Sequence, residues 1–230
     1  RKNIMAEIDA SLKRLQMDYV DVYLLHRWDW TTPIEETMEA MNDVVKAGKA
    51  RYIGASSMYA WQFEKAYQIA KANHWANFIC MQNHVNLIYR EEEREMLYAC
   101  EEEGVVCTPY SPLASGKLTD PWGTQTRRAL NDVQVQKKYA RTEAVDKPIV
   151  DRVEKLAKER GVSMAQIAMA WLLQKPPIQA PILGVTENYM IDEAIAAVDL
   201  QLTKDEITYL EELYVPHKMM GPAAKDGSLY

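Results

Sequence analysis

Short apolar segments alternate with amphipathic helical segments along this chain, and each apolar segment ends in polar or small residues. We predict strands at about 20–25, 50–55, 78–81, 105–108 and 180–183. The ends of these strands carry His26, Ser56 with Ser57, Gln82, Tyr110 and residues 184–186. Such alternation is typical of a parallel sheet with right-handed crossovers. Because the carboxyl ends of parallel strands share one edge, we expect these residues to surround one ligand crevice.

The helical segments carry clear start signals. We predict helices at about 4–15, 33–47, 60–72, 91–103, 148–160, 163–174, 188–197 and 203–213. Capping boxes are expected at residues 32–35, 163–166 and 203–206, the first with a proline at the first helical position. No linker or composition break divides the chain, so we expect one domain over residues 1–230. Within it we predict a long polar connection at 116–147 and an irregular tail at 214–230.

A closed barrel of strand–helix units needs eight such units, and this sequence shows five. The first predicted helix has no strand before it, and a five-stranded sheet would leave two edges exposed. We therefore expect amino-terminal units to be absent from this sequence.

Composition argues against several classes of partner. The net charge is −6, and no Lys/Arg stripe appears, which disfavours nucleic acid and acidic membranes. No apolar run approaches the length that spans a bilayer. The three cysteines have no metal-ligand spacing and fit buried thiols in a reducing compartment. We expect a cytoplasmic protein without a metal, and an oligomer is possible.

Several strand-end residues could carry chemistry, each with a purely structural alternative. His26 could polarise a carbonyl, shuttle a proton or simply hydrogen-bond at a strand end. Ser56, Ser57 and Gln82 offer hydroxyls and an amide that suit an amide-bearing ligand, or they cap loops. Tyr110 lies between prolines and could be a stacking platform or a packing residue.

The phosphate-binding signal is weaker. Residues 184–188 join a strand to a helix N-terminus, where backbone N–H groups could hold a phosphate. A single glycine in this segment is less specific than the glycine patterns of dinucleotide- or nucleotide-binding loops.

Together these segments resemble one family. The motifs are DVYLLHRWD at 21–29, IGASS at 53–57, QN at 82–83, YSPLASGKL at 110–118 and YVPH at 214–217. They are similar to aldo-keto reductases, in particular the bacterial and fungal aryl-alcohol-dehydrogenase-like group. The resemblance implies a (β/α)8 TIM barrel, of which the five carboxyl-terminal units are present. It also implies reduction of aldehydes or ketones with NADPH.

The resemblance also implies roles for individual residues. His26 is expected to orient and polarise the carbonyl. Ser56, Ser57 and Gln82 are expected to hold the nicotinamide carboxamide, and Tyr110 to stack on the nicotinamide ring. The pyrophosphate path is expected to include Ser111, Leu113, Ser115, Gly116 and Lys117. The adenosine phosphate is expected near Gly184, Thr186, Asn188 and Asp192. An aromatic substrate pocket is expected at Trp28 and Trp30.

Two departures from the family pattern affect the expected chemistry. The family's proton-donating Tyr, with its partner Asp and Lys, comes from the first three units, which this sequence does not contain. We therefore expect the 230-residue segment alone to be inactive. The last strand shows no basic residue for a 2′-phosphate, and Glu187 would repel one, so NADH remains open beside NADPH.

Other interpretations remain. The chain could belong to a nicotinamide-sensing regulatory subunit resembling potassium-channel β subunits, or it could be an inactive fragment. We also expect residues 116–147 to form a flap over the pyrophosphate, because Lys117, Arg127 and Arg128 lie in it.

Overall fold

The computed structural model describes residues 1–124, 139, 141–222 and 225. These residues form two compact units. Unit 1 comprises Arg1–Asn83, Glu95–Cys107 and the described residues from Met220 onward, and unit 2 comprises His84–Arg94 and Thr108–Met219. A single domain over the whole chain stays a prediction, and the two units are described separately below.

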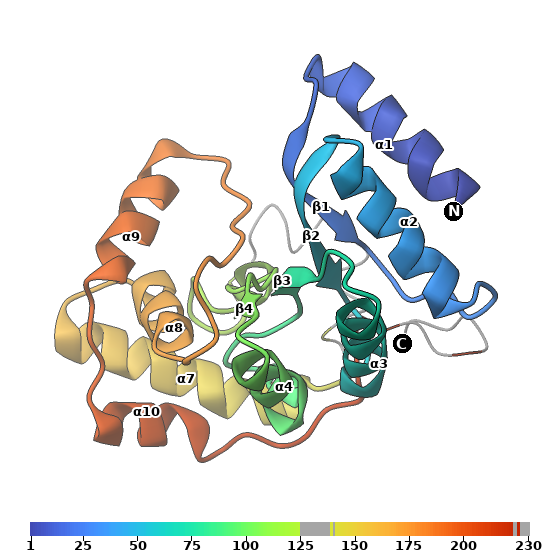
Figure 1. Ribbon diagram of the computed structural model, residues 1–230. Coiled ribbons are helices and arrows are strands. Elements are labelled where there is room, and N and C mark those ends of the chain that lie inside the picture. Colours follow the sequence, from blue (N-terminus) through green and yellow to red (C-terminus); the bar gives the residue numbers. More distant parts are fainter. Residues whose placement is uncertain (125–138, 140, 223–224, 226–230) are drawn as a thin grey trace. The chain divides into compact units, whose positions relative to one another are not determined.

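Unit 1 contains a parallel sheet of four strands in sequence order (Figure 1). The strands are β1 (Val20–Leu25), β2 (Ala50–Ser56), β3 (Phe78–Gln82) and β4 (Val106–Cys107). In the register, Leu24 pairs with Gly54 and Ser56 pairs with Gln82. The first four predicted strands and their parallel order are therefore confirmed.

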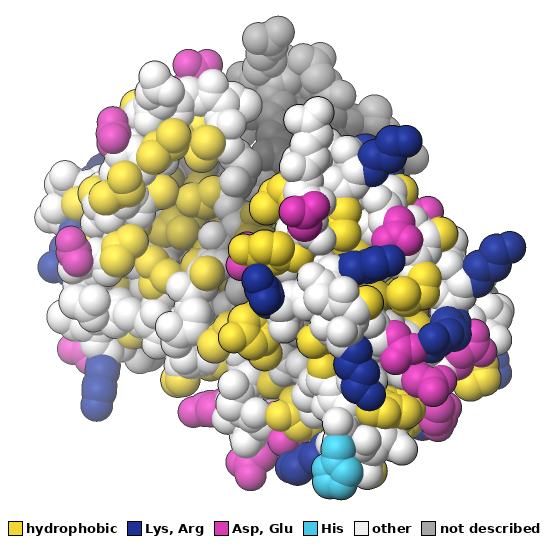
Figure 2. All heavy atoms as spheres, turned by 45° about the horizontal axis from the view of Figure 1, so that its top comes forward, with side chains coloured by type: hydrophobic (Ala, Val, Ile, Leu, Met, Phe, Trp, Pro, Cys, Tyr) yellow, Lys and Arg dark blue, Asp and Glu magenta, His cyan; other side chains and the backbone are white. Residues whose placement is uncertain are grey.

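Helices cover one face of this sheet. They are α1 (Lys2–Leu15), α2 (Ile34–Lys46), α3 (Ala60–Ala72) and α4 (Met96–Glu102), each packed on the next or on a strand. The core between helices and sheet includes the fully buried side chains of Met38, Met41, Ile53, Phe63 and Met81. The other face carries exposed apolar side chains, including Val22, Tyr52, Ile79 and Val106. Figure 2 shows hydrophobic side chains among the surface atoms of the molecule.

Gly54 lies where the strands approach closely. A Cβ at this position would come within 2.5 Å of both the Cys80 Sγ and the Leu24 Cδ2 atoms. These two atoms belong to the neighbouring strands on either side of β2. A glycine therefore lets the flanking side chains meet across the middle strand.

Unit 2 is built mainly from helices. They are α7 (Glu143–Arg160), α8 (Met164–Leu173), α9 (Asn188–Val198) and α10 (Lys204–Glu211), with short 3-10 turns η1 (Glu91–Arg94) and η2 (Ala114–Gly116). α7 packs on α8 and α10, and α8 packs on α9. The capping boxes predicted before α8 and α10 are confirmed, because Gln166 N bonds to Ser163 Oγ and Glu206 N bonds to Thr203 Oγ1, each at 3.2 Å.

The predicted fifth strand at 180–183 is wrong. Only a single parallel bridge forms, between Tyr110 and Ile182. Pro181 has no N–H to donate to a ladder, which limits pairing at this point. β4 is also shorter than predicted, and Pro109 follows it closely.

Three helix starts differ from prediction. The segment predicted at 91–103 is divided into η1 and α4, because Glu95 has φ −143° and ψ −51°. α7 begins at Glu143 and holds Pro148 in its interior, rather than beginning near 148. At α2 the N-cap is Pro33 and no capping box forms, because the Thr32 hydroxyl donates to Asp29 instead.

The predicted long connection overlaps the start of α7. Its predicted limits of 116–147 include the first turn of α7, and residues 125–138 and 140, with Arg127 and Arg128, lie outside the described residues. In the tail, residues 214–222 are described and contain no helix or strand.

Candidate functional site

The loop after β1 carries His26 and is fixed by its own polar contacts. His26 is exposed, and the neighbouring Arg27 donates to the backbone carbonyl of Gly221. Asp29 accepts hydrogen bonds from the Thr31 amide at 2.8 Å and from the Thr32 hydroxyl at 2.5 Å. Hydrogen bonds from Thr32 and Thr31 hold the pKa of the Asp29 carboxyl below its ordinary value. These contacts hold the loop in its conformation.

Three tryptophans meet beside this loop. The Trp28 and Trp30 rings lie 6.4 Å apart, and Trp61 at the start of α3 lies 5.6 Å from the first and 5.9 Å from the second. Trp61 is 51% exposed. The structure thus brings the two predicted pocket residues together and adds Trp61, which sequence reasoning missed. The sequence did carry a signal for Trp61, because it is the second residue of a helix that follows a strand end.

Ser56, Ser57 and Gln82 lie together at the carboxyl ends of β2 and β3. The Ser56 hydroxyl donates to the Gln82 carbonyl at 2.8 Å, and the Ser57 amide donates to the same carbonyl at 3.2 Å. Ser57 has φ +47°, in the left-handed region that is uncommon for a non-glycine residue. Such conformations persist where surrounding contacts impose them, often at ligand sites.

The side chains in this group fit an amide ligand. The Gln82 amide is partly exposed, and within the described part of the chain it makes no hydrogen bond to protein. The two serine hydroxyls lie 3.2 Å apart and can each donate or accept. A carboxamide carries both a donor and an acceptor, so these groups suit it chemically.

In unit 2, Tyr110 is the outer ring of a stack. Its ring lies 5.1 Å from the His84 ring at an interplanar angle of 10°, and His84 lies 4.3 Å from the Tyr89 ring at 16°. His84 is buried, and its Nε2 atom lies 3.2 Å from both the Tyr139 hydroxyl and the Asn86 amide nitrogen. These contacts fix the plane of the Tyr110 ring. His84, which the sequence analysis did not single out, supports Tyr110 directly.

The turn after Tyr110 has unusual backbone conformations. Positive φ angles occur at Ser111 (54°), Ala114 (48°), Ser115 (58°) and Gly116 (99°). Asn86 donates to the Ser111 carbonyl at 3.0 Å and so ties this turn to the ring stack. Leu113, the remaining residue of the predicted phosphate path within this turn, is half-buried.

Lys117 is already engaged in unit 2. Its Nζ atom lies 3.4 Å from Glu143 Oε1 and 4.6 Å from the centre of the Trp122 ring. The ammonium group is therefore held at the end of the turn by an acidic and an aromatic neighbour.

The predicted adenosine-phosphate residues lie on the surface of unit 2. The four residues, all exposed, are Gly184, Thr186, Asn188 and Asp192. Asn188 opens α9, and Glu187 is its N-cap without a side-chain cap. The bridge between Tyr110 and Ile182 brings the start of this segment beside the stack. A phosphate near α9 would meet backbone N–H groups but also the Glu187 carboxylate.

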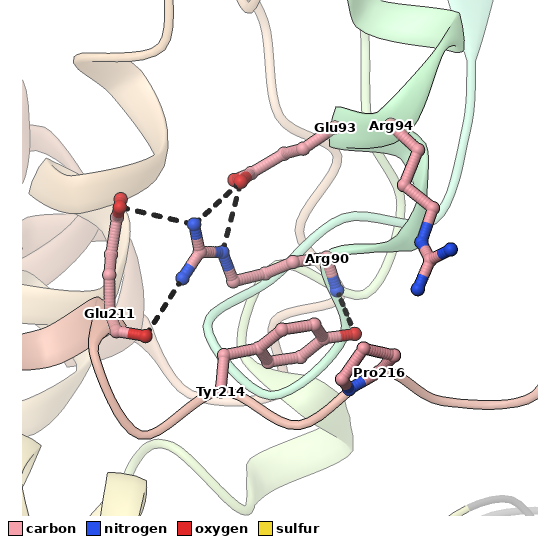
Figure 3. Close-up of a pocket in the computed structure, with 6 residues that line it drawn as sticks. All are labelled: Arg90, Glu93, Arg94, Glu211, Tyr214 and Pro216. Carbon is pink, nitrogen blue, oxygen red and sulfur yellow. Dashed lines mark hydrogen bonds and ion pairs between the residues drawn. The ribbon is translucent and has the colours of Figure 1, made fainter.

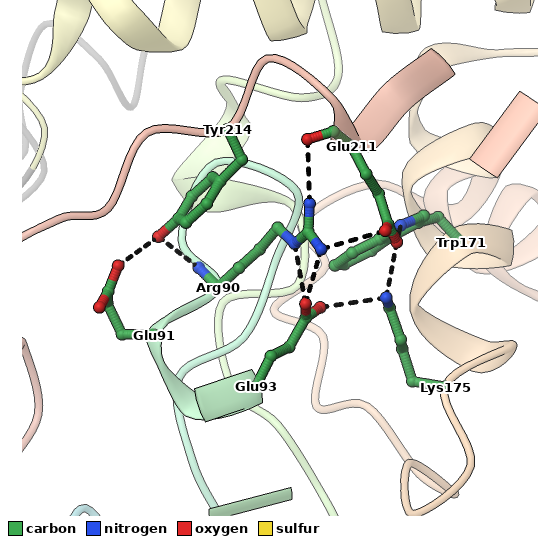
Figure 4. Close-up of polar contacts among 7 residues, drawn as sticks. All are labelled: Arg90, Glu91, Glu93, Trp171, Lys175, Glu211 and Tyr214. Atoms are coloured by element: carbon green, nitrogen blue, oxygen red, sulfur yellow. Dashed lines mark hydrogen bonds and ion pairs between the residues drawn. The ribbon is translucent and has the colours of Figure 1, made fainter. Parts of the chain in front are cut away.

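A separate cavity of 340 Å³ in unit 2 lies among charged residues. It is lined by Arg90, Glu93, Arg94, Glu211, Tyr214 and Pro216, as Figure 3 shows. Arg90 pairs with Glu93 at 2.6 Å and with Glu211 at 3.1 Å, and Lys175 pairs with both carboxylates (Figure 4). These charges neutralise one another, so the cluster stabilises unit 2 rather than presenting an unpaired charge to a ligand.

Burial acts to raise the pKa of two groups of this cluster, but their net pKa shifts are opposite. Burial alone would raise the pKa of Glu211, but the hydrogen bond and charge of Lys175, with Arg90 and Trp171, lower it below its ordinary value. Burial and the Glu91 carboxylate raise the pKa of the Tyr214 phenol.

The described residues contain no group of three His, Cys, Asp or Glu side chains that could hold a metal ion. None of the helices built from those residues is long and apolar enough to cross a membrane. Cys80, Cys100 and Cys107 are buried free thiols, as expected.

The parallel strands, the helices that follow them and the polar strand ends define an α/β protein of the TIM-barrel type. The sequence profile of the Aldo/keto reductase family matches residues 1–215, and this chain belongs to that family. The resemblance seen in the motifs is therefore confirmed.

Named relatives support the same assignment. Versiconal hemiacetal acetate reductase of Aspergillus parasiticus is 51% identical over 218 residues, covering 94% of this chain and 63% of that protein. AAD16 of Saccharomyces cerevisiae, whose name assigns it to the aryl-alcohol dehydrogenases, is 42% identical over 219 residues, covering 95% of this chain and 63% of that protein.

A solved structure is also similar. The thermostable aldo-keto reductase Tm1743, in complex with the inhibitor epalrestat, matches with a TM-score of 0.71 and 30% identity. The match covers 93% of this chain and 66% of that one. The chain thus spans about three fifths of the length of the curated relatives it matches, 63% and 60% for the first two.

Proposed function

We propose that the protein containing this chain reduces aldehydes or ketones to alcohols with a nicotinamide cofactor. The observation that carries the proposal is the group of Ser56, Ser57 and Gln82 at neighbouring strand ends, with the Gln82 amide available to an amide ligand. Membership in the Aldo/keto reductase family supports it. When bound, the cofactor supplies the hydride that reduces the carbonyl carbon.

The chain's own residues have the following proposed roles. Ser56, Ser57 and Gln82 bind the nicotinamide carboxamide, and Tyr110, held by its ring stack, supports the nicotinamide ring. His26 orients and polarises the substrate carbonyl. Trp28 and Trp30, with Trp61 beside them, form the aromatic wall of the substrate pocket.

We propose that the phosphates lie along two segments of unit 2. The pyrophosphate path follows the turn with positive φ angles and its neighbours, namely Ser111, Leu113, Ser115, Gly116 and Lys117. The adenosine phosphate lies near Gly184, Thr186, Asn188 and Asp192. NADPH is the cofactor expected from the family, while the Glu187 carboxylate leaves NADH as the alternative. Buried free thiols support a cytoplasmic location.

Nucleotide binding gives the direct test of the cofactor site. Gln82→Ala in the full-length protein should weaken NADPH binding by about 1–2 kcal/mol, because the carboxamide loses a hydrogen-bond partner. Fluorescence titration measures the dissociation constant, with Gln68→Ala on the exposed side of α3 as the control. Equal affinity of wild type and Gln82→Ala would count against the assignment.

Turnover separates an enzyme from a regulatory nicotinamide sensor. The full-length protein should consume NADPH with an aromatic aldehyde, and His26→Ala should lower kcat by about 10²-fold or more with little effect on NADPH affinity. The 230 residues expressed alone contain no tyrosine matched to the family's proton donor and should show no useful turnover. Binding of NADPH without turnover by the full-length protein would favour the sensor.

A further inference from the structure

The first part of the tail, residues 214–217, is held tightly in unit 2. The Tyr214 hydroxyl donates to Glu91 Oε1 at 2.8 Å and accepts from the Arg90 backbone amide at 2.9 Å (Figure 4). The backbone amide of His217 donates to the same Glu91 oxygen at 2.7 Å. One buried carboxylate thus anchors both ends of this segment.

The ring of His217 faces an acceptor at each nitrogen. Its Nδ1 atom lies 2.5 Å from the Val215 carbonyl oxygen, and its Nε2 atom lies 2.8 Å from Asp146 Oδ1. The side chains of His217 and Asp146 are 1% and 0% exposed. The second oxygen of Asp146 accepts from the Thr142 hydroxyl at 2.6 Å. Because a neutral imidazole has only one N–H, this geometry fits an imidazolium that donates in both directions.

The surrounding charges also favour an imidazolium. Asp146 from α7 and Glu91 from η1 are buried carboxylates, and Arg94, which pairs with Glu91 at 2.9 Å, has a side chain 59% exposed. The Tyr214 ring stacks on His217 at 5.3 Å. Burial alone would lower the pKa of His217, but the hydrogen bond and charge of Asp146, with the Val215 carbonyl and Glu91, raise it above its ordinary value.

The buried ion pair connects to the ring stack under Tyr110. The Tyr89 and His217 rings meet edge to face, with centroids 6.4 Å apart. The Tyr89 ring also lies nearly parallel to the His84 ring and stacks on it. From the other side, Thr142, which contacts Asp146, donates to the Tyr139 carbonyl at 3.2 Å, and the Tyr139 hydroxyl contacts His84. Two short chains of contacts therefore run from the ion pair to His84.

We propose that protonated His217 is a positioning residue for cofactor binding: its ion pair with Asp146 fixes Tyr89 and His84, and through them the plane of Tyr110. The proposal rests on the proposed function in assigning the nicotinamide ring to Tyr110. The proton is retained at low pH and lost as pH rises through the raised folded-state pKa of His217. Nucleotide affinity and the hold on the tail should therefore both weaken toward alkaline pH.

The protonation state can be measured in the wild-type, full-length protein. ¹⁵N NMR of the imidazole should show both His217 nitrogens protonated at pH 7, because each nitrogen faces an acceptor. A neutral His217 ring at pH 7 would overturn the proposal, and this measurement needs no variant.

Trypsin gives a readout of the tail, because the exposed Lys218 follows His217 directly. His217→Gln should be cut after Lys218 about tenfold faster than wild type at neutral pH, since a charged hydrogen bond that closes the segment is lost. His74→Gln, the same change on the surface of unit 1, should be cut at the wild-type rate. Equal rates for wild type and His217→Gln would contradict the proposed hold on the tail.

Nucleotide binding then tests the positioning role. His217→Gln should raise the Kd for NADPH about fivefold at pH 7, and the wild-type Kd should rise toward that of the variant at alkaline pH. His74→Gln should match wild type throughout. If the Kd values of wild type and His217→Gln are equal, or differ by the same factor at every pH, positioning by the imidazolium is refuted. If wild type binds no nucleotide, the proposed function fails and the positioning role with it, while the NMR and trypsin results still decide whether the buried ion pair holds the tail.

Discussion

The two units of this chain bury different kinds of side chain. In the described part of unit 1, the buried polar residues are uncharged: Thr37, Asn42, Ser56, Ser57, Gln62 and Asn83. In unit 2 the buried residues include Glu91, Glu92, Asp146 and His217. Both units have an apolar core, and unit 2 in addition buries charged groups whose ion pairs must remain complete.

This difference follows from architecture. A parallel sheet satisfies its backbone groups in its own ladder, so helices can cover it with apolar side chains. Unit 2 has helices joined by irregular segments, whose backbone groups need side-chain partners. Arg90, for example, donates to the backbone carbonyl of Glu211, and Glu91 accepts from the backbone of His217. Charge neutralisation should therefore destabilise unit 2 far more than unit 1.

The largest expected loss of unfolding free energy follows substitution of Arg90. Arg90→Met leaves Glu93 and Glu211 with Lys175 as their remaining cation and removes the contacts of the guanidinium with the Trp171 and Tyr214 rings. We expect the free energy of unfolding to fall by about 3–5 kcal/mol. Urea unfolding of the full-length protein measures it. Arg51→Met, which removes an exposed guanidinium over Tyr19 in unit 1, should cost less than about 1 kcal/mol, and equal losses would abolish the contrast between the units.

The second largest effect concerns the contribution of Glu211 to the stability of the fold at acidic pH. Its lowered pKa means that the ionised carboxylate stabilises the folded state above the ordinary carboxyl pKa, and that this stability is lost as pH falls through the folded-state value. Glu211→Gln should cost about 2–3 kcal/mol at pH 7 and should flatten the loss of stability below pH ~4.5. Urea midpoints between pH 7 and pH 3.5 give the curve. Glu212→Gln, at an exposed surface pair, should retain the wild-type acid dependence.

The third effect tests packing in unit 1. Gly54→Ala places a methyl group 2.5 Å from Leu24 and Cys80 side-chain atoms, so these side chains or the strands must shift, and we expect a cost of about 2 kcal/mol. The matched change Gly184→Ala meets nothing within 4 Å and should leave the unfolding free energy unchanged. If Gly54→Ala leaves the free energy of unfolding unchanged, the sheet of unit 1 is more pliable than its burial indicates.

The smallest stability effect is expected at Trp61. Trp61→Ala removes two ring contacts from a half-exposed indole and should cost about 1 kcal/mol. If the indole lines the substrate pocket, the KM for an aromatic aldehyde should rise severalfold, while the KM for a short aliphatic aldehyde should change little. A uniform change in both KM values would assign Trp61 to loop packing alone.

Sequence-based prediction was most accurate for the first three strands of unit 1. The strands at 20–25, 50–55 and 78–81 were placed correctly, because apolar runs bounded by polar residues report burial directly. In unit 2 the predicted helix start near 148 and the strand at 180–183 were wrong. There the buried contacts of Asp146 and the proline at 181 determine where elements begin.

The sequence by itself determined the family, the parallel order of four strands and the residues that end them. Tertiary structure alone decided the stack of Tyr89, His84 and Tyr110, the addition of Trp61 to Trp28 and Trp30, and the buried pair of His217 and Asp146. The physical reason is range. Periodicity and capping depend on neighbours a few residues apart, whereas these contacts join residues up to 71 positions apart, whose pairing no local pattern records.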